Sequence, residues 1–424
     1  MKCMDERVIA LVDCDNFFAS CERIFQPKLQ HRPVVVLSNN DGCVIARSNE
    51  AKALGIKMGA PAFKNETFFA RHGVHVFSSN FALYGDMSKR VMETIRTEAD
   101  SIEVYSIDEA FLMFEGPSAL ERARLLRKKV FSQTGIPVSI GLASTKTLAK
   151  IATRIAKKMP EMNGVFQLQS ELDISRALQR CPVKKIWGIG TRSALKLQSY
   201  GISNALQLSQ ADTSWVRKNL SITGVRLQSE LLGISCSPVG FASSRKKNIR
   251  TSRSFGADVN TWSSLKESVT AFASSCATKL RSEKSCCASV TVFVSTNPFK
   301  HDILQYQNSR TIKLDVPSND SMEIVSVAND ALKYIYRDGH AYKKAGVIVG
   351  DIADASQVQL GLFDTIDRSK RRAVMKSVDM INSRLGRDKV RLAAQGFDRK
   401  WRLKQERLSP CYTTRFTDML TVRV

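Results

Sequence analysis

Short apolar runs alternate with amphipathic helical patterns through the first third of this chain, and this alternation constrains its fold more than any other feature. The runs VIALVD and RPVVVLS predict buried strands, while SNEAKALGI predicts a helix that ends at Gly55. Farther along, SIEVYSIDEAFLMF predicts two strands joined by a turn, and the strand PVSIGLA precedes the basic helix KTLAKIATRIAKK. Strands that alternate with helices and include an antiparallel pair indicate an α+β sheet domain rather than a strictly doubly wound one.

The rest of the chain divides into segments of different character. Residues 171–234 contain short helical patterns broken by glycine, which predicts a small helical module. Residues 235–254 contain five basic residues and no acidic one, which predicts a charged linker. A second α+β unit follows at residues 255–352, and strong strand signals end beyond it.

Length and charge limit the class of protein. A chain of 424 residues exceeds a single core and predicts roughly two to four domains. Lys and Arg number 64 against 40 Asp and Glu, which gives a formal net charge of +24. This excess favours a polyanionic partner, above all nucleic acid, over a merely soluble basic protein.

The cysteines and the N-terminus bear on the location of the protein. The ten cysteines form no C-x-x-C pair and have no matching histidine cluster, so zinc is not expected. A reducing cytoplasm suits them best. The apolar run near the N-terminus breaks at Asp13, too early for a secretion signal or a membrane span. We therefore expect a soluble cytoplasmic protein with no membrane partner.

Three carboxylates stand out in predicted strands. Asp13 ends the run VIALV, and Asp108 and Glu109 are adjacent in the otherwise apolar run YSIDEAFLMF. Burying an ionised carboxylate is costly unless metal ions, a Lys or Arg, or water compensate it. Successive strand residues point to opposite faces, so Asp108 and Glu109 can share one ligand only if the chain bends there. The three carboxylates together suit the oxygen coordination that Mg²⁺ prefers. The alternative is that Asp108 and Glu109 are ordinary turn residues exposed to solvent.

Four segments carry a resemblance to a known family: DCDNFFASCE (13–22), SNNDGCVIARSNEAKALGIKMG (38–59), YSIDEAF (105–111) and GLASTKTLAKIATRIAKK (141–158). Each alone would be a weak signal, but the occurrence of all four in this order is specific. Together they resemble the Y-family translesion DNA polymerases, and among these the UmuC-type members. The resemblance implies an error-prone, template-directed DNA polymerase that extends a primer past damaged bases in an SOS-type response to DNA damage. The alternatives are a non-catalytic DNA-binding scaffold recruited to the sliding clamp, and another palm-type enzyme such as a nucleotide cyclase.

The resemblance also implies an α+β multidomain fold arranged like a right hand. The implied parts are a palm (1–16 and 77–170), small fingers (17–76), a helix-hairpin-helix thumb (171–234), the basic linker (235–254), an α+β little finger (255–352) and a C-terminal tail (353–424). The reaction implied is attack of a primer 3′ hydroxyl on the α-phosphate of a dNTP, with two Mg²⁺ ions as cofactors.

Matching positions imply the residues of the active site. The catalytic residues and Mg²⁺ ligands would be Asp13, Asp108 and Glu109, with the backbone carbonyl of Cys14 as a further ligand. The nucleotide site would comprise Phe17, Phe18, Asn49, Lys52 and Lys157. Phe18 matches an aromatic gate beneath the sugar that excludes a ribose 2′ hydroxyl, whereas we expect Phe17 to pack in the core. The two lysines would contact the β- and γ-phosphates.

Other matching positions imply contacts with primer–template DNA. These are Lys146, Lys150, Gly188, Gly190, Arg245, Lys246, Lys247 and Arg250. Lys146 and Lys150 are one helical turn apart and could serve the substrate or the DNA backbone. The two glycines match a hairpin whose backbone N–H groups approach DNA phosphates, and such contacts carry no sequence information.

The tail implies protein partners. The segment QLGLF resembles a sliding-clamp-binding pentapeptide, and its predicted contacts are Gln359, Leu360, Leu362 and Phe363. The glutamine offers a polar anchor and the Leu-Phe pair offers two apolar knobs. Residues 366–404 then hold thirteen Lys or Arg against four Asp. By resemblance alone, a UmuD′-like homodimer would engage this tail, and a RecA filament is a further partner.

Overall fold

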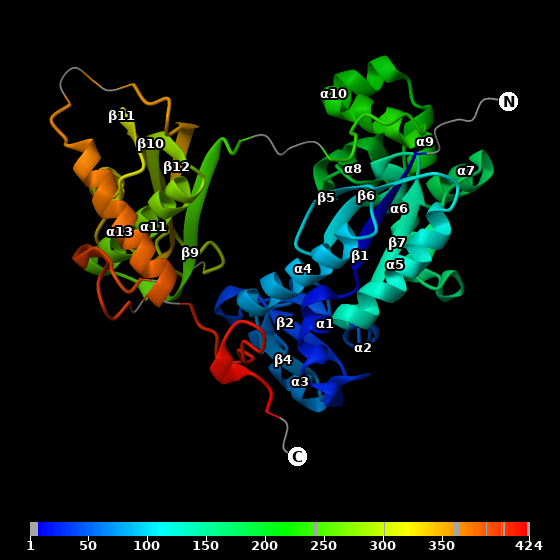
Figure 1. Ribbon diagram of the computed structural model, residues 1–424, viewed down its shortest axis with the longest axis horizontal. Coiled ribbons are helices and arrows are strands. Elements are labelled where there is room, and N and C mark those ends of the chain that lie inside the picture. Colours follow the sequence, from blue (N-terminus) through cyan, green and yellow to red (C-terminus); the bar gives the residue numbers. More distant parts are fainter. Residues whose placement is uncertain are drawn as a thin grey trace. The chain divides into compact units, whose positions relative to one another are not determined.

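The computed structural model describes residues 7–240, 245–300, 302–359, 361, 364–386, 388–399, 401 and 403–421. The chain forms two compact units (Figure 1). The first comprises Met1–Ser38, Gly42–Ala242 and Arg407–Val424, and the second comprises Asn39–Asp41 and Ser243–Glu406. The end of the chain therefore returns to the first unit.

The first unit is built on a five-stranded sheet with the order β5-β6-β1-β7-β8. Its strands are β1 (Arg7–Cys14), β5 (Ser101–Val104), β6 (Glu109–Glu115), β7 (Val138–Ala143) and β8 (Val165–Gln167). The central strand β1 is antiparallel to both of its neighbours, β6 and β7. The strands predicted at VIALVD and PVSIGLA and on both sides of the turn before β6 are all present, and the α+β class is confirmed.

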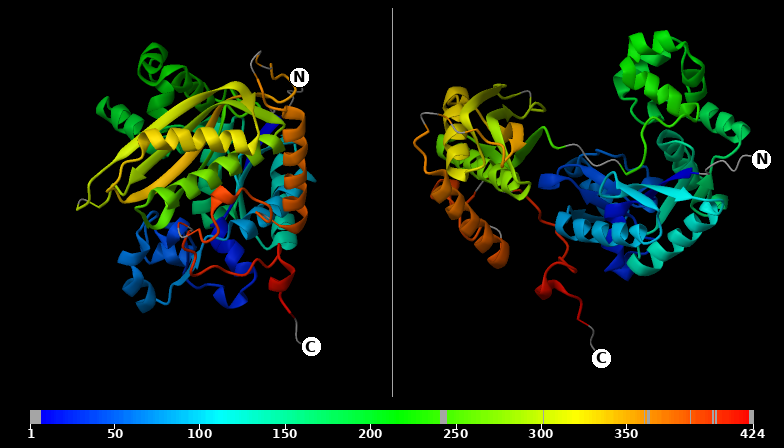
Figure 2. Two further views of the ribbon diagram at one scale, coloured as in Figure 1. Left: turned by 90° about the vertical axis from the view of Figure 1, so that its left-hand side faces the viewer. Right: turned by 45° about the horizontal axis from the view of Figure 1, so that its top comes forward.

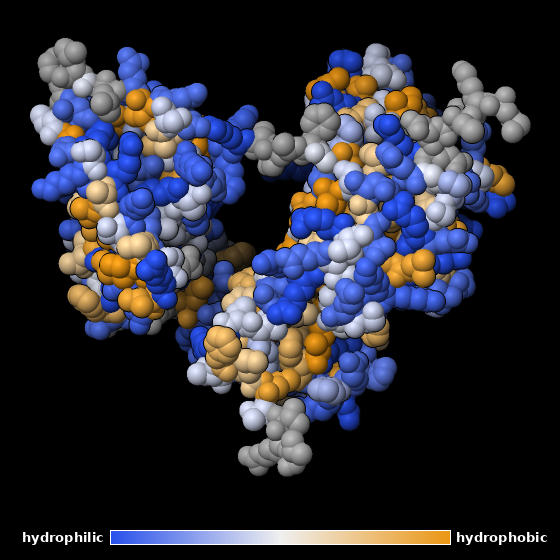
Figure 3. Space-filling view, viewed as in Figure 1, coloured by the Kyte–Doolittle hydropathy of each residue, from blue (hydrophilic) through white to orange (hydrophobic). Residues whose placement is uncertain are grey.

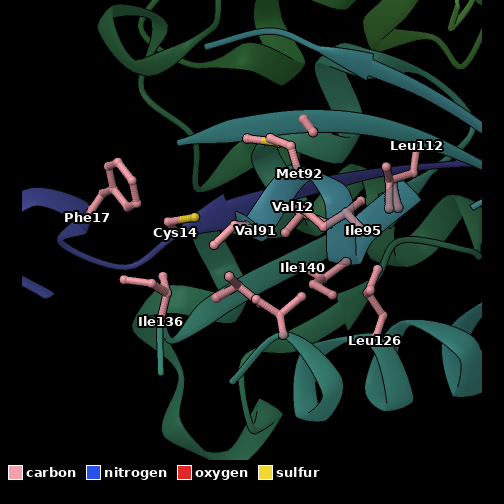
Figure 4. Packing of buried hydrophobic residues seen from close by; sticks show 14 of the residues in the cluster. Val12, Cys14, Phe17, Val91, Met92, Ile95, Leu112, Leu126, Ile136 and Ile140 are labelled. Atoms are coloured by element: carbon pink, nitrogen blue, oxygen red, sulfur yellow. The ribbon is translucent and has the colours of Figure 1, made fainter. Parts of the chain in front are cut away.

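Helices cover both faces of this sheet. They are α4 (Phe81–Arg96) and α5 (Ala119–Thr134) on one face and α6 (Lys146–Lys158) on the other. Val12 packs in a core with Ile95 of α4 and Leu126 of α5 (Figure 4), whereas Leu11 packs in a second core with residues of α6. A strand buried on both faces appears in the sequence as a continuous apolar run, which is the pattern of VIALV.

The first unit also contains a small sheet and two groups of helices. The sheet has the order β3-β2-β4 and comprises β2 (Val34–Leu37), β3 (Val44–Arg47) and β4 (His75–Ser78). The short helices near it are α1 (Phe17–Ile24), α2 (Asn49–Ala53) and α3 (Glu66–Arg71). The helical module predicted after residue 170 comprises α7 (Glu171–Gln179), α8 (Thr191–Ser199), α9 (Ala205–Gln210) and α10 (Thr213–Leu231).

The second unit is a four-stranded antiparallel sheet with the order β11-β10-β12-β9. Its strands are β9 (Asn248–Val259), β10 (Ser285–Thr296), β11 (Gln307–Ser318) and β12 (Tyr342–Asp354). Its helices are α11 (Trp262–Ser282), α12 (Ser321–Ile335) and α13 (Arg368–Leu385). Helices α11 and α12 lie side by side against the sheet and share one core with it (Figure 2).

Both edge strands of this sheet differ from the sequence-based expectation. Strand β9 begins at Asn248, inside the segment expected to be a linker, and no strand was expected at β11. In β9 the basic residues are exposed while Ile249 and Phe255 are buried. An edge strand with one solvated face contains few apolar residues, so its sequence resembles a polar connection.

The surface agrees with the highly charged composition. Hydrophilic side chains cover much of the face shown in Figure 3, with hydrophobic ones scattered among them. Within the part of the chain that the structure describes, no helix is long and apolar enough to cross a membrane. The nine cysteines in that part are free thiols.

Candidate active site

Strand β1 carries Asp13 to the face of the sheet that α6 covers. Side chains alternate along a strand, so Asp13 follows Ile9 and Leu11, which both pack on the α6 side. The antiparallel partner of Asp13 in β6 is Glu109. Directly opposed residues of an antiparallel pair have Cβ atoms about 5 Å apart. Two of the predicted carboxylates are therefore cross-strand neighbours.

The third carboxylate lies in a bend that immediately precedes β6. Ser106 Oγ donates to Asp108 Oδ1 at 2.6 Å, and the backbone N–H of Glu109 donates to Ser106 Oγ at 3.0 Å. The backbone N–H of Cys14 donates to the carbonyl of Asp108 at 2.9 Å, so the bend is joined to the end of β1. The turn that would let Asp108 and Glu109 share a ligand is thus present.

Helix α6 supplies cations to this carboxylate cluster. Lys150 and Lys157 are seven residues apart and lie on one face of the helix. Lys150 Nζ donates to both carboxylate oxygens of Glu109 at 2.9 Å. Lys157 Nζ donates to Asp13 Oδ1 at 2.6 Å and lies 3.2 Å from Asp15 Oδ1. In this structure, lysine is the cation that neutralises Asp13 and Glu109.

Lys146 lies one turn before Lys150 on the same helix and is buried. Its Nζ donates to Glu103 Oε2 at 2.7 Å and lies 5.1 Å from the centroid of the Phe111 ring. Lys150 is also surrounded by rings, with its Nζ 4.7 Å from the Tyr105 centroid. Both lysines were predicted to serve substrate or DNA, and each has a carboxylate partner here.

Burial shifts the proton affinities in the cluster. It raises the pKa of Asp13 to about 6, although Lys157 acts to lower it, and the nearby Glu109 and Asp108 raise it further. Burial acts to lower the pKa of Lys157, but the attraction of Asp13 and Asp15 leaves that pKa raised. The raised pKa values of Asp13 and Lys157 both favour the protonated forms of these two groups.

The cluster can be tested for its fit to a metal ion. Among the described residues, no three His, Cys, Asp or Glu side chains converge closely enough to hold a metal as they lie. Asp13, Asp108 and Glu109 nevertheless offer the oxygen donors that divalent ions prefer. Lys150 holds both carboxylate oxygens of Glu109 and Lys157 holds Oδ1 of Asp13, so a metal ion would compete with these ammonium groups.

The predicted nucleotide-binding aromatic residues lie on α1. Phe17 is 4% exposed and packs in the core of the sheet, where Figure 4 shows it beside Cys14. Phe18 is half-buried and stacks on Tyr84 of α4, with ring centroids 4.5 Å apart. Phe81 meets Phe18 edge-on at 6.0 Å.

Asn49 and Lys52 lie on α2 and are joined through Asn16, a residue that the sequence reasoning missed. Asn16 Nδ2 donates to Asn49 Oδ1 at 3.0 Å, and Lys52 Nζ donates to Asn16 Oδ1. Burial, followed by the proximity of Lys157 and Arg47, lowers the pKa of Lys52. The sequence signal was an asparagine at the start of a helix; it adopts a left-handed φ of 51° and does not cap that helix.

Asp15 is a second residue that the sequence prediction left out. Ser139 Oγ donates to its carboxylate oxygens at 2.9 and 3.0 Å, so the group is held beside Lys157. The available signal was a second acidic residue two positions beyond Asp13, directly after the strand.

The predicted DNA-binding positions belong to both units. In the first unit, Gly188 has a left-handed φ of +86° with open space at its Cβ position, and Gly190 precedes α8. In the second unit the four basic residues are exposed: Arg245, Lys246, Lys247 and Arg250. Arg245 pairs with Asp354 and Lys246 with Glu283, each at 2.5 Å, whereas Arg250 stacks on Phe293.

The predicted clamp-binding pentapeptide is only partly described. Leu360, Leu362 and Phe363 lie outside the described residues. Gln359 is exposed and follows β12 after a short connection.

Known proteins share both the fold and the sequence. The fold resembles a Y-family DNA polymerase chimera of Dbh and Dpo4 with a TM-score of 0.64 and 21% identity, over 82% of this chain and 99% of that one. A structure titled insertion ternary complex of Dbh DNA polymerase matches the same shares with a TM-score of 0.54 and 21% identity. The fold is therefore that of a Y-family DNA polymerase.

Sequence comparisons narrow the class. The model of the impB/mucB/samB family matches residues 12–154, its C-terminal domain matches 246–362, and a domain of unknown function (DUF4113) matches 372–422. Protein ImpB and protein UmuC of Salmonella typhimurium are each 42% identical over 98% of this chain and 100% of their own length. DNA polymerase IV of Desulfatibacillum aliphaticivorans is 28% identical over 92% of this chain and 97% of its own.

These matches identify an error-prone translesion DNA polymerase. The chain belongs to the impB/mucB/samB family, and its relatives include UmuC.

Proposed function

We propose that this polymerase transfers nucleotides with two Mg²⁺ ions held by Asp13, Asp108, Glu109 and the backbone carbonyl of Cys14. The observation that carries the proposal is the register of β1 and β6, which sets Asp13 opposite Glu109 with Asp108 in the adjoining bend. Y-family DNA polymerases require divalent metal ions. When bound, such ions would activate the primer 3′ hydroxyl and neutralise charge on the phosphate oxygens.

The lysines of α6 would act as exchangeable counter-ions in this proposal. Lys150 and Lys157 neutralise Glu109 and Asp13 in the structure and would release them when metal and nucleotide bind. Lys157, now free of Asp13, would join Lys52 and Asn49 in contacting the β- and γ-phosphates of a dNTP. Asn16, which is hydrogen-bonded to both Asn49 and Lys52, would hold these two residues at their present separation. Positioning and charge neutralisation are the main means by which a protein promotes phosphoryl transfer.

Phe18 would act as the gate that selects the sugar. Its ring is flat, half-buried and fixed by the stack on Tyr84. A ribose 2′ hydroxyl pressed against such a ring would lose water without gaining a hydrogen bond, which disfavours ribonucleotides.

Primer–template DNA would be held mainly through its phosphates. The turn at Gly188 and Gly190 would let the backbone approach DNA phosphates, since both glycines are exposed and open space lies at the Cβ position of Gly188. Exposed cations at the start of the second unit, such as Lys247 and Arg250, would add electrostatic attraction. These contacts carry no base specificity, as a polymerase that copies any template requires.

Protein partners and location are proposed on the family likeness and the sequence. The pentapeptide at 359–363 would bind a sliding clamp, and the basic tail would engage a UmuD′-like homodimer and a RecA filament. The free thiols of the described cysteines suit a cytoplasmic location.

Primer extension on an abasic-site template tests the proposed mechanism. The native chain, assayed with Mg²⁺ and with or without clamp and accessory proteins, should bypass the lesion. The Asp108→Ala, Glu109→Ala double variant should lose bypass while it keeps DNA binding, and Glu115→Ala at the exposed end of β6 serves as the control. If neither the native chain nor the variants synthesise DNA with all partners present, while salt-sensitive DNA binding is intact, the result would favour a non-catalytic scaffold instead.

A further inference from the structure

The C-terminal segment 407–421 belongs to the first unit (red in Figure 1). It is attached first to the end of β4, where Ser78 N–H donates to the carbonyl of Arg407 at 2.9 Å. The buried Asn80 side chain then donates to the carbonyl oxygens of Ser409 and Pro410 at 3.0 and 3.2 Å. These contacts use main-chain atoms of the segment, so they fix its path.

A buried acid lies where the segment meets α1. Glu22 is 0% exposed and accepts hydrogen bonds from Tyr84 Oη at 2.6 Å and Ser409 Oγ at 3.0 Å. Its other oxygen, Oε2, has no hydrogen-bond partner among the described residues. Burial raises its pKa against the effect of the two hydroxyl donors. A carboxyl group kept in such a place without a cation destabilises the fold, which points to a role other than stability.

The hydrogen bonds at Glu22 connect the segment to the proposed sugar gate. Tyr84 is completely buried, and its ring stacks on Phe18 at 4.5 Å with an angle of 15° between the rings. The path is therefore continuous: Ser409 contacts Glu22, Glu22 contacts Tyr84, and Tyr84 supports the ring of Phe18.

A second contact holds the segment at the same C-terminal end of α1. Tyr412 stacks on Phe25, with centroids 4.6 Å apart and an angle of 14°. Phe25 is the residue that ends α1, the helix that also contains Phe18 and Glu22. Two contacts, with Glu22 and with Phe25, therefore hold the segment at the C-terminal end of α1.

We propose that this C-terminal segment is a positioning element for the nucleotide site, in which Ser409 acts through Glu22 and Tyr84 to hold the Phe18 ring in place. The segment thereby sets how strictly the enzyme discriminates deoxyribonucleotides from ribonucleotides. The inference rests on the proposed role of Phe18, and it assigns a task to part of the region that matches a domain of unknown function.

Removal of one hydroxyl group should loosen the gate. Without the Ser409 hydroxyl, Glu22 keeps a single donor, so its carboxyl group and the Tyr84 hydroxyl can change orientation together. We expect Ser409→Ala to lower the ratio of kcat/KM for dNTP to kcat/KM for the matching rNTP by about three- to tenfold, the range of one lost hydrogen bond. Ser409→Thr retains a hydroxyl and should restore most of the ratio.

Two further variants of the full-length chain make the test specific. Tyr84→Phe keeps the ring stack but removes the donor to Glu22, so it should reproduce the effect of Ser409→Ala. Phe416→Ala removes a ring that is 91% exposed in the same segment and should leave the ratio unchanged. Melting temperatures of all variants, with assays well below them, separate loss of discrimination from unfolding.

The Phe18→Ala background separates the two levels of the proposal. If Phe18→Ala alone leaves discrimination unchanged, the proposed gate is wrong. If Phe18→Ala lowers it but Ser409→Ala does not, the gate stands and the positioning role is overturned. An effect of Ser409→Ala that persists undiminished in the double variant would also overturn it, because coupled residues must act non-additively.

Discussion

At the scale of single residues, the carboxylates near the end of β1 would serve two states of one site in the proposed mechanism. Asp13 and Glu109 are half-buried and would be destabilising as unpaired charges, and Lys157 and Lys150 neutralise them in the structure. The same carboxylates are the proposed ligands of Mg²⁺. A lysine that yields its carboxylate to a metal can then turn to an anionic substrate.

The ion pair between Lys150 and Glu109 should matter most to stability when no metal ion is bound. Lys150→Met should destabilise the metal-free protein by about 1–3 kcal/mol, because Glu109 loses its only described cationic partner. Saturating Mg²⁺ should remove most of this deficit, since the ion would neutralise Glu109 instead. Urea unfolding with EDTA and with Mg²⁺ measures both values.

A matched control for Lys150 lies on α4. Lys89 pairs with Glu93 at 3.8 Å, and both side chains are largely exposed. Lys89→Met should cost about 0.5 kcal/mol or less and should not respond to Mg²⁺. An equal deficit for Lys150→Met with and without Mg²⁺ would contradict the exchange of lysine for metal.

At the scale of secondary-structure elements, the site depends on how closely α6 approaches the sheet. Gly141 in β7 lies under α6, and a Cβ atom there would stand 2.0 Å from the backbone nitrogen of Thr153. Thr153 Oγ1 also donates to the carbonyl of Leu11 at 3.1 Å, which ties α6 to β1. The lysines reach their carboxylates because this glycine admits the helix.

The second prediction follows from that close approach. Gly141→Ala should push α6 away from β7 and destabilise the protein by about 3 kcal/mol, with loss of primer extension as the lysines shift. Gly85→Ala is the matched control, because Gly85 is an exposed helical residue with open space at its Cβ position. It should stabilise the protein by about 0.5–1 kcal/mol. If unfolding curves show that both variants are less stable than the native protein, or that both are more stable, the packing argument is wrong.

Element prediction from the sequence worked best where strands are buried on both faces. VIALV and PVSIGLA are continuous apolar runs, and both became central strands. The edge strands β9 and β11 expose polar residues on one face, so β9 was partly taken for linker and β11 was missed. Edge strands depend on pairing with a neighbour, and a local pattern contains little information about that neighbour.

At the scale of the whole molecule, the net charge of +24 is the property most relevant to DNA binding. The predicted DNA-binding cations are not equivalent in the structure. Arg245 and Lys246 have carboxylate partners at 2.5 Å, while Arg250 rests on a ring. Exposed cations that are not held by a carboxylate are the more available to phosphates.

The third prediction concerns this difference. Lys247→Ala should reduce the slope of log affinity against log salt by about 0.9, the change expected for one lost phosphate contact. Lys333→Ala on α12, where the exposed lysine pairs with Asp330, should leave the slope unchanged. Fluorescence anisotropy with primer–template DNA at several salt concentrations measures it. If the Lys247→Ala variant has the same salt dependence of DNA affinity as the native protein, Lys247 does not contact DNA phosphates.

The residues of the candidate site were predictable to different degrees. Asp13, Asp108 and Glu109 were proposed because carboxylates in apolar runs are conspicuous; the expected bend before β6 is present, and their role as metal ligands stays a prediction. Asn16 and Asp15 were missed, since a polar residue after a strand is ordinary in any turn. Their importance appears only from their partners, Lys52 and Ser139, which are distant in sequence.

The sequence by itself determined the α+β class and the order of the main elements, and it singled out three carboxylates as candidate ligands, because these inferences depend on hydrophobic pattern and on residue type. Only the tertiary structure decided which lysine neutralises which carboxylate and that Ser409 reaches the buried Glu22 beside Tyr84. Those contacts join residues far apart in the chain. Their formation depends on the close packing of helices, strands and the returning C-terminal segment, which no local pattern encodes.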